Sequence, residues 1–101
     1  MSASPQPTDD RVVIAVVRTG GIAGLRRRWR VERDPADAED LIALIDSCPW
    51  DSEPAAATGA DRFVWSIRAR TPEHQHEQEL PDAALDGPWR DLVDAVRAAS
   101  R

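Results

Sequence analysis

The chain has 101 residues, of which 42% are hydrophobic and 31% are charged, a size and composition typical of one globular domain and unlike a disordered chain. Its formal net charge of −5 argues against general nucleic-acid binding, because neutralising phosphates requires a basic surface. No apolar run approaches the roughly 18 residues of a membrane span, so we expect a soluble protein without membrane contact.

The first ten residues are polar and include two prolines, Pro5 and Pro7. We therefore expect a disordered arm over residues 1–10, followed by a single domain over residues 11–101. The arm lacks the basic and apolar stretches of a secretory signal, which predicts a cytoplasmic protein. Cys48 is the only cysteine, which fits a reducing compartment, and its apolar surroundings favour a buried, inert thiol over a reactive one.

Two strands are expected around a glycine-rich turn. Residues 11–18 form a β-branched run that is apolar on both faces, which indicates a strand inside a sheet. Residues 25–32 alternate: Leu25, Trp29 and Val31 lie on one face with Arg27, while Arg26, Arg28, Arg30 and Glu32 lie on the other. A short turn containing Gly20, Gly21 and Gly24 would join the two strands into a β-hairpin.

A helix is expected next, with Asp34 as its N-cap and Pro35 at the first helical position. Apolar residues at helical spacing then predict an amphipathic helix that ends near Cys48; they are Ala38, Leu41, Ile42 and Ile45. Residues 49–60 are rich in proline, alanine and glycine and are expected to form a loop, which Trp50 anchors against the core.

The second half of the chain repeats this order of elements. Residues 61–70 alternate as a strand with Phe63, Trp65, Ile67 and Ala69 inward. After a turn at Pro72 and Glu73, the polar residues 74–80 return as a strand. This turn would place Arg68 opposite Glu77 and Ser66 opposite Glu79, and so polar an edge resists self-association, so we expect a monomer when the protein is free.

A last helix opens at Gly87 and Pro88, and its apolar stripe is Trp89, Leu92, Val93 and Val96. The order is therefore β-β-α-β-β-α. The simplest packing is an α+β fold, a four-stranded antiparallel sheet with two helices on one face.

No catalytic, cofactor or metal site is expected. The glycines lack the G-x-G-x-x-G spacing, no lysine follows them, and a strand rather than a helix comes next, which argues against a phosphate cradle. His74 and His76 point to the same side of a strand, but a metal site needs further ligands, so solvated histidines are the better interpretation. No serine or carboxylate has the neighbours of a catalytic constellation, so we do not expect an enzyme.

Two features are left for function. Ile22 is an apolar residue at the tip of a hairpin turn, where it could enter the cleft of another protein or fold back onto the core. Arg26, Arg28 and Arg30 form a stripe on one strand face. The stripe could be a solvated face balanced by Glu32, or it could bind an acidic protein partner or, less favourably, a nucleic-acid backbone.

The sequence also resembles a known family. Val-Val-Arg-Thr-Gly-Gly-Ile-Ala-Gly-Leu-Arg, residues 16–26, is similar to the hallmark segment of the emfourin-like family, usually written around GGFAGI. The resemblance extends over roughly residues 11–99, through the helix at residues 41–45, the strand entry Gly-Ala-Asp-Arg-Phe-Val-Trp at residues 59–65, and the C-terminal helix. The chain departs from the family pattern in having Ile22 where phenylalanine is common and Trp65 where tyrosine is common.

The resemblance implies a proteinaceous inhibitor of thermolysin-like zinc metallopeptidases, especially of the protealysin type, often encoded beside its target. Such peptidases prefer a bulky apolar residue just after the scissile bond, so Ile22 or Leu25 could fill that pocket. The residues expected to bind the target are Thr19, Gly20, Gly21, Ile22, Ala23, Gly24 and Leu25, with a secondary contact through Arg26, Arg28 and Arg30. The zinc would belong to the target.

Overall fold

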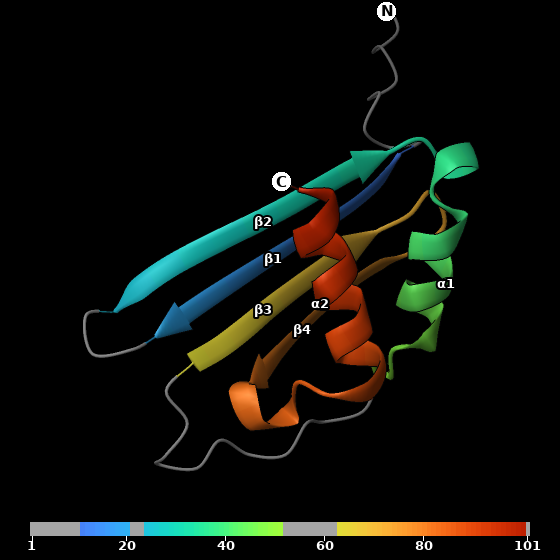
Figure 1. The fold of residues 1–101 in the computed structure, drawn as a ribbon. Coiled ribbons are helices and arrows are strands. Elements are labelled where there is room, and N and C mark those ends of the chain that lie inside the picture. Colours follow the sequence, from blue (N-terminus) through green and yellow to red (C-terminus); the bar gives the residue numbers. More distant parts are fainter. Residues whose placement is uncertain (1–10, 21–23, 52–62, 101) are drawn as a thin grey trace, which may run out of the picture.

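The computed structural model describes residues 11–20, 24–51 and 63–100 (Figure 1). The disordered arm predicted at residues 1–10 and most of the loop predicted at residues 49–60 lie outside these ranges. The helices and strands follow in the predicted order β-β-α-β-β-α: β1 (Val12–Gly20), β2 (Leu25–Arg33), α1 (Glu39–Ser47), β3 (Phe63–Arg70), β4 (Gln75–Pro81) and α2 (Gly87–Ala99). Short 3₁₀ turns, η2 (Pro35–Asp37) and η3 (Asp82–Ala84), precede the two helices.

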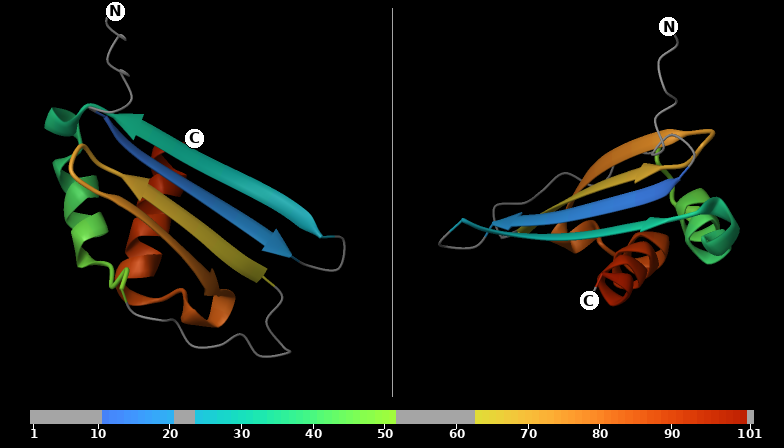
Figure 2. Two further views of the ribbon diagram at one scale, coloured as in Figure 1. Left: turned by 180° about the vertical axis from the view of Figure 1, so that it is seen from behind. Right: turned by 90° about the horizontal axis from the view of Figure 1, so that it is seen from above.

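The four strands form one antiparallel sheet in the order β2-β1-β3-β4. Strand β1 is therefore interior, as its two apolar faces predicted. Both helices lie on the same side of the sheet, seen most clearly from above (Figure 2). We call the side that carries the helices the inner face and the opposite side the outer face. The α+β architecture predicted from the sequence is confirmed.

The core lies between the inner face and the helices. In β1, Val12, Ile14 and Val16 are buried, whereas Val13, Ala15 and Val17 on the outer face are only half-buried. The predicted stripe of α2 closes the core from the other side; it consists of Trp89, Leu92, Val93 and Val96, all buried. The alternating apolar residues of the strands and the apolar stripe of α2 therefore pack against each other in one core.

The register of β3 and β4 is also as predicted. Arg68 lies opposite Glu77, with which it forms an ion pair, and Ser66 lies opposite Glu79. The turn closes where the Thr71 amide donates a hydrogen bond to the His74 carbonyl oxygen at 2.8 Å. Pro72 and Glu73 are then the two turn residues, and this short connection fixes the register.

The predicted start of the first helix is wrong. Asp34 makes no side-chain capping bond, and the residues after it form the 3₁₀ turn η2. Ala38 follows with φ −122° and ψ 20°, outside helical geometry, and is buried. Helix α1 begins only at Glu39, with the Ile42 amide bonded to the Ala38 carbonyl oxygen at 2.8 Å. The tighter turn lets Ala38 enter the core before the helix begins.

Trp50 anchors the end of α1 to the core, as expected. Its indole N–H donates to the Ile45 carbonyl oxygen at 2.7 Å, and its ring meets Trp89 edge-on at 4.8 Å between centroids. The same ring stacks on His76 at 4.9 Å. His76 is therefore half-buried, and the expectation of two solvated histidines holds only for the exposed His74.

One-sided burial can be tested with two neighbours in β1. Val16→Ala is expected to lower the free energy of unfolding by about 2 kcal/mol, because Val16 is fully buried and the lost methyl groups leave a cavity. The matched change Val17→Ala carries the same loss of strand propensity but is expected to cost less than about 1 kcal/mol, because Val17 lies on the outer face. Urea unfolding followed by tryptophan fluorescence measures both, and equal losses would contradict a core on one face.

The predicted burial of the Cys48 thiol can also be tested. Burial, with a smaller contribution from Asp91, raises the pKa of the Cys48 thiol from 9.0 to about 11. At about pH 8 such a shift lowers the thiolate fraction roughly 100-fold, so an aromatic disulfide reagent should label the native thiol about 100-fold more slowly than the urea-unfolded one. The protonated thiol is favoured in the folded state, so this contribution to stability is present below pH 9 and lost as pH rises towards 11. Similar labelling rates would contradict a buried thiol.

Candidate functional site

The loop that joins β1 and β2 is flanked by two glycines with positive φ. Gly20 has φ 134° and Gly24 has φ 63°, a backbone region that other residues rarely adopt. Two of the three glycines expected in the turn therefore have backbone angles that favour glycine. The tip itself, with the predicted target-binding residues Gly21, Ile22 and Ala23, lies outside the described residues.

The described target-binding residues divide between the two faces of the hairpin. Thr19 pairs with Arg26 on the outer face, whereas Gly20 pairs with Leu25 on the inner face. Leu25 is 71% exposed, and among the described residues it is the one large hydrophobic side chain that is exposed. The end of the hairpin where β1 ends and β2 begins extends beyond both helices (Figures 1 and 2), and Leu25 is the first residue of β2.

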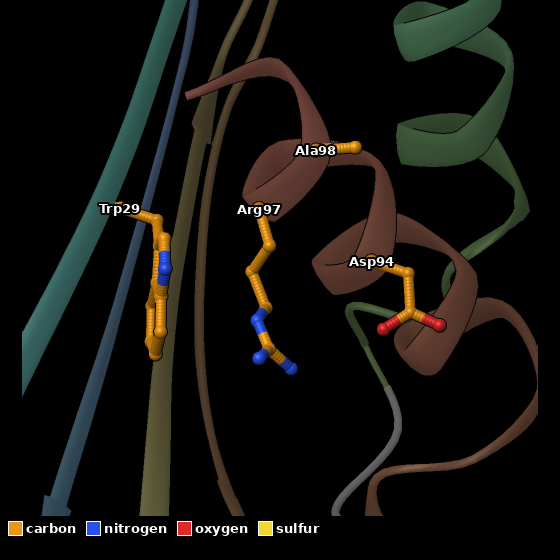
Figure 3. Close-up of a pocket in the computed structure, with 4 residues that line it drawn as sticks. All are labelled: Trp29, Asp94, Arg97 and Ala98. Atoms are coloured by element: carbon orange, nitrogen blue, oxygen red, sulfur yellow. The ribbon is translucent and has the colours of Figure 1, made fainter. Parts of the chain in front are cut away.

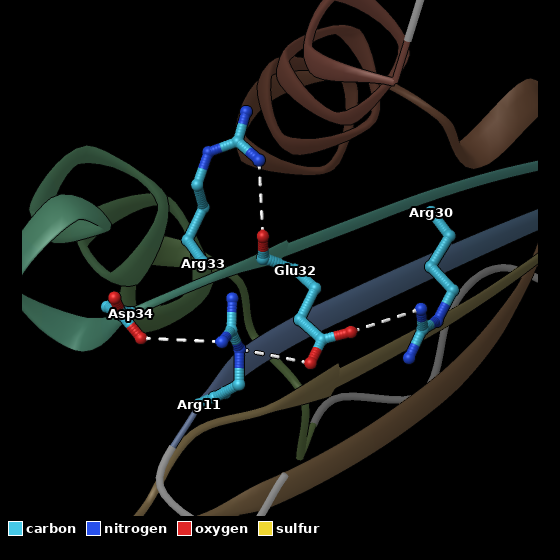
Figure 4. Close-up of polar contacts among 5 residues, drawn as sticks. All are labelled: Arg11, Arg30, Glu32, Arg33 and Asp34. Carbon is cyan, nitrogen blue, oxygen red and sulfur yellow. Dashed lines mark hydrogen bonds and ion pairs between the residues drawn. The ribbon is translucent and has the colours of Figure 1, made fainter. Parts of the chain in front are cut away.

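The arginine stripe, defined as Arg26, Arg28 and Arg30, lies on the outer face as predicted. Arg30 forms an ion pair with Glu32 at 3.2 Å, and Glu32 forms a second ion pair with Arg11 at 3.0 Å (Figure 4). Neither Arg26 nor Arg28 has a carboxylate partner among the described residues. Glu32 therefore neutralises Arg30 at one end of the stripe, and the end nearer the loop stays positively charged.

A second group of arginines lies on the inner face, and the sequence analysis did not identify it. Trp29 and Trp65 stack with ring centroids 5.9 Å apart. The guanidinium carbon of Arg18 lies 5.8 Å from the centroid of Trp29, 5.6 Å from Trp65 and 4.9 Å from Phe63. This half-buried guanidinium is held against aromatic rings by cation–π contacts.

Two exposed arginines complete this group from different elements. The guanidinium carbons of Arg27, on β2, and Arg97, on α2, lie 5.6 Å and 5.1 Å from the Trp29 ring centroid. Figure 3 shows the Arg97 side chain extending from α2 beside the face of Trp29, at a pocket that Asp94 and Ala98 also line. We call Arg18, Arg27, Arg97 and Trp29 the inner arginine cluster.

The sequence pattern predicted the position of one member of this cluster. Alternation placed Arg27 on the same face as Trp29, and the structure confirms it. Arg97 had no such signal, because it reaches Trp29 only through the packing of α2 on the sheet.

The histidines do not make a metal site with neighbouring residues that the structure describes. His74 and His76 stack on each other at 5.8 Å, but in the described ranges no group of three histidine, cysteine or carboxylate side chains is placed to hold a metal ion. Nor does any helix within those ranges have the length and apolar character needed to cross a membrane.

Comparison with known proteins gives one match. The family model of Emfourin matches residues 16–97, from the middle of β1 through the second hairpin to most of α2. Searches among curated proteins and among solved structures each found no significant match. Because the match extends over most of the sequence and includes the glycine-rich loop, the chain belongs to the Emfourin family.

Proposed function

We propose that this protein inhibits a thermolysin- or protealysin-like zinc metallopeptidase by inserting its β1–β2 loop, residues 19–25, into the active-site cleft. The Emfourin family is a family of metallopeptidase inhibitors, which supports the class of function. The choice of peptidase and the role of the loop are our own proposal. In this mechanism the protein supplies no catalytic group, and the zinc ion is the peptidase's.

The observation that carries the proposal is the exposure of Leu25 at the end of a projecting hairpin. A large apolar side chain that is 71% exposed costs free energy in water, and a pocket in a partner would recover it. The paired strands below the loop hold its ends at Gly20 and Leu25. A loop whose ends are already fixed loses little conformational entropy on binding, which favours tight inhibition.

The loop can be tested with two charged variants, Ile22→Asp and Leu25→Asp. If either side chain fills the pocket beyond the scissile bond, a carboxylate there should raise the inhibition constant at least about 30-fold. The measurement is a titration of a thermolysin-like peptidase, ideally one encoded beside this gene, with circular dichroism as a check of the fold.

Ala43→Asp is the matched control, because Ala43 is exposed on α1, at the end of the sheet away from the loop. This variant should inhibit like the wild type. Inhibition retained by both loop variants would place the contact elsewhere, and a wild type that inhibits no such enzyme would refute the proposed function.

A second candidate function is a non-enzymatic interaction module that binds an acidic partner through the arginine stripe. The observation in its favour is that, in the part of the chain that the structure describes, Arg26 and Arg28 lack carboxylate partners and lie on the face opposite α1 and α2. On our main proposal the stripe makes only a secondary contact with an acidic rim of the peptidase.

The double variant Arg26→Gln, Arg28→Gln separates these functions. As a secondary contact the stripe should mainly affect association, so inhibition should weaken no more than about tenfold and the change should shrink at high salt. The control is Arg90→Gln, an exposed arginine of α2. If this double variant abolished inhibition while the loop variants did not, the stripe would be the principal binding surface.

A further inference from the structure

We propose that the inner arginine cluster is a binding site for a carboxylate side chain of the partner protein, located beside the loop. This inference rests on the proposed function in assigning the carboxylate to the rim of the peptidase cleft. It concerns the face of the hairpin opposite the arginine stripe.

The first argument is the absence of counter-charge. The guanidinium carbons of Arg18, Arg27 and Arg97 all lie within 5.8 Å of the centroid of Trp29. Among the described residues, none of these arginines forms an ion pair. Asp94 lines the same pocket as Arg97, yet its ion pair is with Arg90, at 3.9 Å. Positive charges gathered around one indole repel each other, and an anion bound among them would relieve that repulsion.

The second argument is the geometry of the guanidinium groups. A guanidinium that lies over an aromatic ring uses its flat face for the contact. Its N–H groups lie in the plane of the guanidinium and stay available, and their fork matches the two oxygens of a carboxylate. Arg27 and Arg97 are both exposed, so a carboxylate can reach them from solvent.

The third argument is the position of the cluster relative to the loop. Arg18 pairs with Arg27, and the neighbouring pair on the same face towards the loop is Gly20 with Leu25. The exposed Leu25 and the cluster therefore form one continuous surface on the inner face. Tryptophan and arginine are the residues most enriched among those that dominate binding energy in protein interfaces. An acidic residue on the cleft rim would meet this surface when the loop enters.

The site can be tested without any peptidase. Acetylated hexaglutamate is titrated into the full-length protein while NMR follows the indole N–H of Trp29 and the Nε–H groups of the arginines. The expected result is saturable shifts at Trp29 and Arg97 in the wild type, with affinity at least about tenfold lower in Arg27→Gln, Arg97→Gln. The control is Arg33→Gln, an exposed arginine on the same strand and face as Arg27 but at the end away from the loop, and it should bind the peptide like the wild type. Equal binding by the double variant, or shifts confined to Arg26 and Arg28, would overturn the inference.

The same variants assign the carboxylate to the peptidase. If the wild type inhibits, Arg27→Gln, Arg97→Gln should raise the inhibition constant at least about tenfold while Arg33→Gln leaves it unchanged. Inhibition unaffected by the double variant would refute this assignment and leave the proposed function intact. If the wild type inhibits no such enzyme but the peptide still binds at Trp29, the proposed function fails and the carboxylate site stands.

Discussion

The structure depends on a sheet that buries only one of its two faces. Val12, Ile14 and Val16 alternate with half-buried neighbours, and α2 covers the buried side. The hairpin of β1 and β2 extends beyond α1 and α2, so neither helix covers the sheet where β1 ends and β2 begins (Figure 1). Residues at this end do not have to pack into the core. Leu25 and most residues of the arginine stripe and the inner arginine cluster lie here.

Most of this fold could be predicted because its signals are local. Period-two alternation in β3 and the stripe of α2 each depend on a few neighbouring residues, and the two-residue turn at Pro72 was enough to fix the pairing of Arg68 with Glu77. The start of α1 could not be predicted in the same way. Asp34 followed by Pro35 suits a 3₁₀ turn as well as a helix, and the burial of Ala38, which depends on tertiary packing, decides between them.

In the candidate site, too, some features follow from local sequence patterns and others depend on tertiary packing. The glycine-rich turn between β1 and β2 and the side of the sheet on which Leu25 lies followed from composition and alternation. The inner arginine cluster did not, because Arg27 and Arg97 are far apart in sequence and meet only where α2 crosses β2. The position of Ile22 lies outside the described residues, so its role in binding is still a prediction from the sequence.

The arginine stripe and the inner arginine cluster would have the same effect on how the protein approaches an acidic partner. The chain carries a net charge of −5, yet the end of the hairpin nearer the loop presents guanidinium groups on both faces, with Arg26 and Arg28 on the outer face and Arg18 and Arg27 on the inner face. An acidic cleft would repel the molecule as a whole and attract this end, so encounters in which the hairpin leads would be favoured over others. On the proposed function, the exposed Leu25 would supply affinity that salt does not screen, whereas the arginines would determine which way round the protein enters. Orientation and affinity would thus come from different residues of one hairpin, and ionic strength should change the rate of association more than the rate of dissociation.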